Sequence, residues 1–67
     1  MFAERLKELR LEKGLSQADL SKELNGKITA SAIGHWENRK RIPNFDAVIL
    51  LAQYFGVTTD YLAGLED

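Results

Sequence analysis

Apolar side chains recur every three or four residues along most of this chain, which is the spacing that gathers them on one face of an α-helix. The pattern predicts five helices joined by short turns, over residues 2–13, 17–24, 30–38, 45–55 and 59–63. No segment has the sustained alternation that is typical of a β-strand. We therefore expect an all-α fold, a compact five-helix bundle.

Short polar side chains stand where the last four of these helices begin, as is typical of helix N-caps. The candidate caps are Ser16, Thr29, Asn44 and either Thr58 or Thr59. Asp19 follows Ser16 by three residues, which favours a capping box and places a negative charge at the positive end of the helix dipole. After the third helix we expect Asn38 to be the left-handed residue, because asparagine tolerates a positive φ better than Arg39 does.

The same spacing predicts the buried face of each helix. Its members are Phe2, Leu6, Leu9, Leu20, Leu24, Ile33, Trp36, Phe45, Val48, Leu51, Ala52 and Phe55. Trp36 could stack on a base, but its spacing from Ile33 assigns it to the core. The apolar run over 47–52 is wider than one buried face requires, so we expect an exposed patch that binds a second copy; the alternative is that these residues are all core. The members of this patch are Ile49, Leu50, Tyr61 and Leu62.

Length and composition exclude several classes of protein. The chain has 67 residues, no cysteine and one histidine, so we expect one domain over residues 1–67, no disulfide, no metal site and no cofactor. The longest apolar run is too short to cross a bilayer. We expect a cytoplasmic protein with no membrane partner and no small-molecule effector. An enzyme is rejected, because the carboxylates are scattered and no glycine-rich phosphate loop is present.

Charge is segregated along the chain, although the formal net charge is only −1 and the pI is about 5.7. Residues 25–41 contain four basic side chains and a single acidic one, whereas residues 42–67 contain no lysine or arginine. The basic side chains are Lys27, Arg39, Lys40 and Arg41. A basic middle can orient a molecule on DNA despite a near-zero total charge. The sequence therefore favours a nucleic-acid partner.

Several short segments follow one another in an order that indicates a family. They are RLKELR at 5–10, GLSQADL at 14–20, Ile33, WEN at 36–38, Pro43, FGV at 55–57 and DYL at 60–62. With these segments the chain resembles the phage-repressor (Xre/Cro-type) helix-turn-helix domain over almost its whole length. The resemblance implies a lambda-repressor-like bundle in which helices 2 and 3 form the helix-turn-helix. The second helix would cross the DNA backbone and the third would enter the major groove.

The resemblance also implies roles for individual residues. It places Thr29, Ala30, Ser31 and His35 at the positions that face the bases. It places Gln17, Asn38, Lys40 and Arg41 where the family approaches phosphates. Arg10 and Glu37 stand where related repressors have an ion pair between the first helix and the end of the third. Arg10 could instead bind phosphate. Gly34 leaves room for close backbone approach, so we count it among the base contacts.

Two departures from the family pattern bear on DNA binding. The turn at Asn25-Gly26-Lys27 is longer than usual, and Arg39 stands where the family usually has glycine. We expect Lys27 and Arg39 to contact phosphates. The resemblance implies a sequence-specific double-stranded DNA-binding transcriptional regulator, a repressor that acts as a homodimer on a pseudo-palindromic operator. The alternative is an antitoxin-like or docking module with weak or no DNA binding, which the short side chains of the third helix favour.

Overall fold

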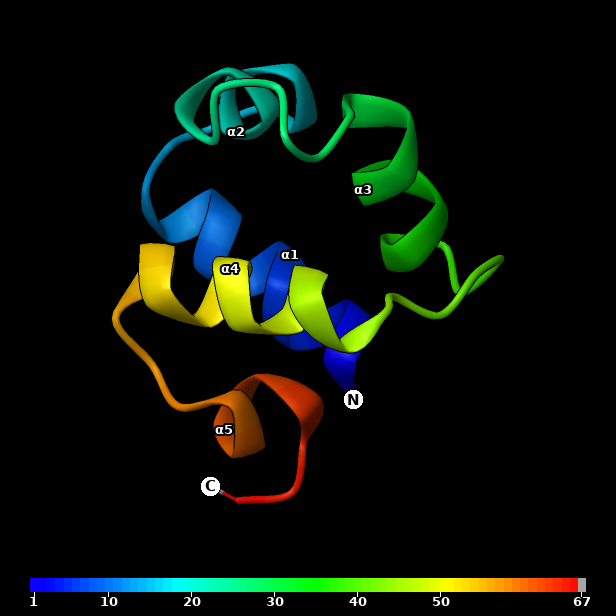
Figure 1. Ribbon diagram of the computed structural model, residues 1–67, viewed down its shortest axis with the longest axis vertical. Coiled ribbons are helices and arrows are strands. Elements are labelled where there is room, and N and C mark those ends of the chain that lie inside the picture. Colours follow the sequence, from blue (N-terminus) through cyan, green and yellow to red (C-terminus); the bar gives the residue numbers. More distant parts are fainter. Residues whose placement is uncertain (67) are drawn as a thin grey trace.

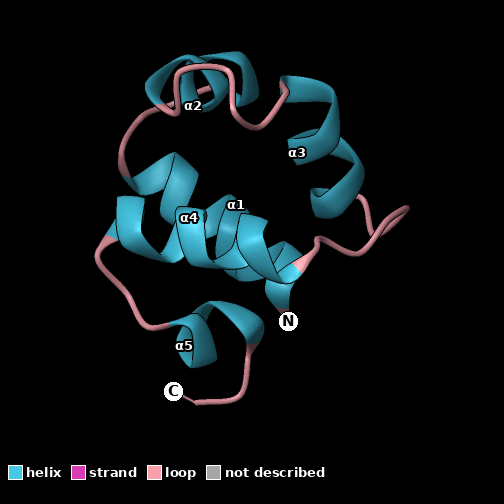
Figure 2. Ribbon diagram, in the orientation of Figure 1, coloured by secondary structure: helices cyan, strands magenta, loops and turns pink. Residues whose placement is uncertain are grey.

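The computed structural model describes residues 1–66, and these residues form five α-helices with no strand among them (Figures 1 and 2). The helices are α1 (Phe2–Glu12), α2 (Gln17–Glu23), α3 (Ala30–Glu37), α4 (Phe45–Phe55) and α5 (Thr59–Ala63). The expected all-α bundle is confirmed. Every helix lies where the apolar spacing predicts it, and α1, α2 and α3 each end one residue earlier than expected.

The helices are arranged in two groups around a central pair. In Figure 1, α2 and α3 lie together above α1 and α4, and α5 lies below them. Contacts join α2 to α3, α1 to both α3 and α5, and α4 to α5. The connection from α3 to α4 projects away from the body of the molecule (Figure 1). Among the helices described, none is long and apolar enough to cross a membrane.

All four predicted N-caps are formed, and Thr58 rather than Thr59 caps α5. Each cap side chain accepts a hydrogen bond from the backbone N–H three residues later. The bonds are Asp19 N to Ser16 Oγ at 2.9 Å, Ala32 N to Thr29 Oγ1 at 3.0 Å, Ala47 N to Asn44 Oδ1 at 2.8 Å and Tyr61 N to Thr58 Oγ1 at 2.9 Å. Asp19 Oδ2 accepts from the N–H of Ser16 at 3.0 Å, which completes the capping box.

The left-handed residue after α3 is Arg39, with φ 61°, and not Asn38, whose φ is −90°. The expectation for Asn38 was wrong because the helix end is set by its hydrogen bonds. Arg39 N donates to Trp36 O at 3.1 Å and Lys40 N donates to His35 O at 2.8 Å. These two bonds form a Schellman motif, which places the left-handed residue one position beyond the C-cap.

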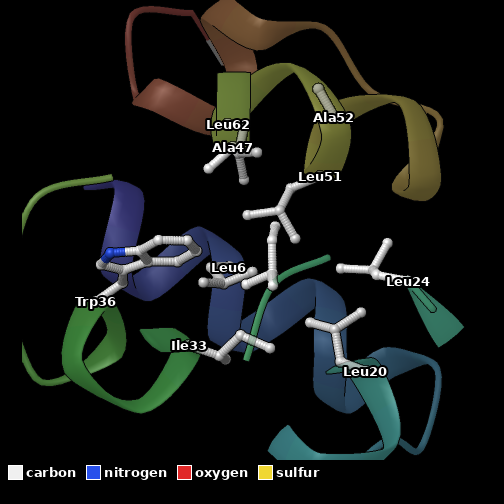
Figure 3. Packing of buried hydrophobic residues seen from close by; sticks show 10 residues of the cluster. Leu6, Leu20, Leu24, Ile33, Trp36, Ala47, Leu51, Ala52 and Leu62 are labelled. Atoms are coloured by element: carbon white, nitrogen blue, oxygen red, sulfur yellow. The ribbon is translucent and has the colours of Figure 1, made fainter. Parts of the chain in front are cut away.

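All five helices contribute side chains to one core (Figure 3). Its fully buried large side chains are Leu6, Leu20, Ile33, Leu51 and Leu62. Trp36 is 9% exposed and belongs to this core, as its spacing predicts. Phe45 was expected in the core but is 70% exposed. As the first residue of α4, Phe45 lies at the edge of the bundle, and the buried face of α4 begins two residues later at Ala47.

Candidate nucleic-acid interface

A buried ion pair joins α1 to the C-terminal end of α3. Arg10 Nε and Nη2 donate to Glu37 Oε2 and Oε1, each at 2.8 Å, and the two side chains are only 8% and 4% exposed. Arg10 Nη1 donates to the carbonyl of Leu15 at 2.8 Å. The hydrogen bonds to Glu37 raise the pKa of Arg10 although burial opposes this. The pairing expected between Arg10 and Glu37 is present, so Arg10 is not a free phosphate ligand.

Gln17 connects α2 to the same ion pair. Its Nε2 donates to Glu37 Oε1 at 3.2 Å, so α1, α2 and α3 share one polar network. A Cβ built on Gly34 would lie 3.1 Å from Gln17 Oε1. Gly34 therefore faces α2. Gln17 thus occupies the room left by the missing side chain, and the expected base contact at Gly34, which is half-buried, stays a prediction.

The outer face of α3 presents short side chains. Ser31 and its neighbour Thr29 are exposed, whereas Ala30 and His35 are half-buried. An open hollow runs between this face and the connection to α4; its lining includes Thr29, Ser31, His35, Arg41 and Ile42. The structure therefore joins the outer face of α3 and the 41–44 segment in one continuous surface.

Basic side chains bracket α3. Lys27 is exposed just before its N-terminal end, and Lys40 and Arg41 are exposed beyond its C-terminal end, next to the exposed Asn38. Arg39 forms an ion pair with Glu4 of α1, and both of these side chains are largely exposed. Sequence reasoning missed the pairing with Glu4, because residues 35 positions apart give no local signal.

The longer turn before α3 has a definite structure. Asn25 and Gly26 both have left-handed φ values, 57° and 74°. Gly26 N donates to Ser21 O at 2.9 Å, and Ser21 Oγ donates to Ile28 O at 2.6 Å. These bonds close the end of α2 and hold the chain on its approach to α3. The added residues leave α2 and α3 in contact and expose Lys27.

Of the four expected residues of the dimer patch, Leu62 is buried and the other three are half-buried. Leu62 is fully buried, so its assignment to an exposed patch is corrected: α5 packs it inward. Leu50 packs against the core and lines a hollow with Leu24 and Lys27 on the α2 side. The ring of Tyr61 lies under the guanidinium of Arg5, 4.2 Å from its centroid. Ile49 is half-buried.

The helices α2 and α3 contact each other, and a buried polar network fixes both to α1. With cations at both ends of α3, this is the arrangement of a helix-turn-helix domain. A family described as "Helix-turn-helix" matches residues 6–62. The chain belongs to this family. The family expected from the sequence is thereby confirmed.

Curated relatives carry the names of transcriptional regulators. The HTH-type transcriptional activator BcrR of Enterococcus faecalis is 35% identical over 66 residues, which cover 98% of this chain and 31% of the relative. The HTH-type transcriptional regulator ImmR of Bacillus subtilis is 33% identical, and the match covers 98% of this chain and 50% of the relative. The SPbeta prophage-derived uncharacterized HTH-type transcriptional regulator YonR of Bacillus subtilis is 39% identical, with 92% and 56% covered. The chain thus spans about a third to a little over half the length of these relatives. No solved structure matches the chain significantly.

Proposed function

We propose that this chain is the sequence-specific, double-stranded DNA-binding domain of a transcriptional regulator. The observation that carries the proposal is the network of Arg10, Glu37 and Gln17, which holds α2 and α3 as one unit with cations at both ends of α3. The names of the relatives, an activator and two regulators, support the same role. Whether binding represses or activates depends on where the operator lies, and we propose repression when it overlaps a promoter.

Phosphate neutralisation supplies most of the affinity in this proposal. The phosphate-binding residues are Gln17, Lys27, Asn38, Arg39, Lys40 and Arg41. Discrimination between bases comes from Thr29, Ser31, His35 and Ala30. A serine hydroxyl both donates and accepts, and an alanine methyl packs on a thymine methyl. With no long side chain on this face, DNA shape carries part of the specificity.

We propose that two copies bind together on a pseudo-palindromic site, with residues 1–67 forming one domain in each. Paired copies place two reading helices about one DNA turn apart, which matches protein symmetry to operator symmetry. The exposed parts of Ile49 and Tyr61 are the candidates for the contact between copies. Leu50, half-buried like Ile49, is a third candidate. We further propose that the protein acts in the cytoplasm, where double-stranded DNA is accessible.

A second candidate function is a protein-interaction module of the same fold. The short side chains on the outer face of α3 favour it, because a DNA reader usually carries longer donors there. Its binding surface would be the exposed apolar positions of α4 and α5. It predicts weak or no retention of DNA.

Selection from a pool of random duplexes at moderate salt tests the proposal. We expect an enriched inverted repeat, with Ser31→Ala and His35→Ala each altering the preferred bases and Lys40→Ala weakening all sites alike. Lys7 is exposed on α1, away from α3 in sequence, and Lys7→Ala is the control variant: it should change neither the preferred bases nor the affinity. Retention of no duplex would overturn the proposal and leave the interaction module.

A further inference from the structure

Ile42 is the most exposed large apolar side chain among residues 1–66. Its exposed fraction is 93%, compared with 78% for Leu65 and 70% for Phe45. Ile42 lies in the projecting connection between α3 and α4, directly after the run Arg39, Lys40 and Arg41. A fully solvated isoleucine beside three cations contributes nothing to the core, so its position calls for another role.

The backbone holds this side chain in place. Ile42 precedes Pro43, and the ring of a proline restricts the preceding residue to an extended conformation. Two open hollows meet at Ile42. One lies toward the outer face of α3 and includes Ser31 and His35, and the other lies toward the start of α1 and includes Met1 and Phe2. Ile42 therefore stands on a ridge next to the proposed base-reading face.

We propose that Ile42 packs against the C5-methyl group of a thymine at the edge of the bound DNA site, and so acts as a specificity-determining residue. This inference rests on the proposed DNA-binding function. With α3 in the major groove, the hollow shared with Ser31 and His35 places Ile42 at the border of that groove. The thymine methyl is the apolar group that a base pair presents there.

The charges around Ile42 favour DNA over a protein as its partner. Lys40 and Arg41 are exposed on the same connection, and a protein interface centred on Ile42 would have to desolvate them. Charged residues are depleted at the centre of protein interfaces for this reason. On DNA the same cations remain paired with phosphates while the methyl group removes Ile42 from water.

The contact would supply discrimination that α3 lacks. Cytosine and uracil lack the methyl group of thymine. Burial of Ile42 against that group therefore raises the affinity for sites with thymine at one position of each half-site. The short side chains Ala30 and Ser31 leave room for the connection to approach the bases closely.

A coupling experiment tests this inference. The probe is the duplex selected from the random pool, in which each thymine is replaced in turn by deoxyuracil, and its affinity is measured for the wild type and for Ile42→Ala. We expect one thymine per half-site whose replacement weakens wild-type binding by about three- to tenfold, as burial of one methyl contact predicts. Ile42→Ala should bind the thymine-containing duplex more weakly by a similar factor. Replacement of that thymine should not weaken its binding further. Ile42→Val should keep most of the wild type's sensitivity to that replacement.

Leu65→Ala is the matched control, since Leu65 is a similarly exposed apolar residue that follows α5 and lies outside the hollow that Ile42 shares with Ser31 and His35. It should bind like the wild type and keep the full sensitivity to uracil. If Ile42→Ala remains as sensitive to every replacement as the wild type, the inference is overturned while the DNA-binding proposal stands. The inference is also overturned if Ile42→Ala disrupts dimerisation and no thymine replacement affects the wild type and the variant differently. That result would assign Ile42 to a protein contact. If no duplex is retained, both proposals fail.

Discussion

Arg10 and Glu37, which are 27 residues apart in the sequence, are joined by two hydrogen bonds of 2.8 Å in a setting where both side chains are more than nine-tenths buried. The pair links α1 to the last turn of α3. Gln17 adds α2 through the same carboxylate. The orientation of the helix-turn-helix against the rest of the bundle therefore depends on one polar network.

Removal of one partner should be costly, because it leaves the other charge buried and unpaired. We expect Arg10→Ala to lower the free energy of unfolding by about 3–5 kcal/mol, measured by urea denaturation. The double variant Arg10→Met with Glu37→Leu removes both charges and should recover much of the lost stability. It should also weaken DNA binding, because Gln17 loses its hydrogen-bond acceptor on Glu37. A loss below about 1 kcal/mol in Arg10→Ala would show that the pair is solvated.

Arg39 occupies a left-handed conformation in which a side chain is disfavoured. Arg39→Gly should therefore raise the free energy of unfolding by about 1 kcal/mol, less the contribution of the exposed ion pair with Glu4. The same variant should bind DNA more weakly, since it removes a proposed phosphate contact.

Arg39→Asn is the matched control, because asparagine also tolerates the left-handed region. It should reproduce the loss of DNA affinity with a smaller gain in stability. If Arg39→Gly lowers stability and leaves DNA affinity unchanged, Arg39 is structural rather than a phosphate ligand.

The capping box of α2 predicts a pH dependence. The pKa of Asp19 is lowered in the folded state, chiefly by the hydrogen bond from the backbone N–H of Ser16. Since the folded pKa lies below the unfolded value of about 3.9, the stabilisation is complete above that pH and is lost as the pH falls through the folded pKa.

Urea denaturation of the wild type and Asp19→Asn as a function of pH checks this dependence. The wild type should be the more stable at neutral pH, and the difference should shrink under acid conditions. Ser16→Ala should cost about 1 kcal/mol and reduce the pH dependence of Asp19. A difference that grows as the pH falls would contradict the assignment.

The proposed contact between copies places Ile49 at a subunit interface. Ile49→Lys should shift the protein toward monomer in sedimentation equilibrium and weaken binding to an inverted repeat more than to a half-site. Leu11→Lys, the same kind of change at an exposed apolar position on α1, is the control and should have neither effect. Dimers that survive Ile49→Lys would move the interface elsewhere.

Local features of the fold were predictable from the sequence. The N-caps at Ser16, Thr29 and Asn44 depend on one residue and a hydrogen bond three positions away, and all three form as expected. The burial of Ile33 and Trp36 follows from helical spacing alone.

Features that depend on how helices meet were not predictable in this way. Gly34 faces α2 because of the angle between α2 and α3, which no local pattern encodes. Leu62 is buried because α5 packs against α1, where Arg5 donates to Tyr61 O at 2.6 Å. The exposure of Phe45 depends on how the chain enters α4.

In the proposed mode of binding, cations at the ends of α3 hold DNA phosphates. The most direct test is the affinity for the selected duplex as a function of salt, for the wild type and for Lys40→Glu with Arg41→Glu. We expect wild-type affinity to fall steeply with salt: the slope of log affinity against log salt concentration should be about −0.9 for each phosphate neutralised. The variant should bind much more weakly, and its affinity should depend less on salt. Lys7→Glu with Lys13→Glu, the same charge change on and just after α1, should retain most of the affinity. Equal affinity and equal slopes for the wild type and the Lys40–Arg41 variant would show that these cations do not hold DNA phosphates.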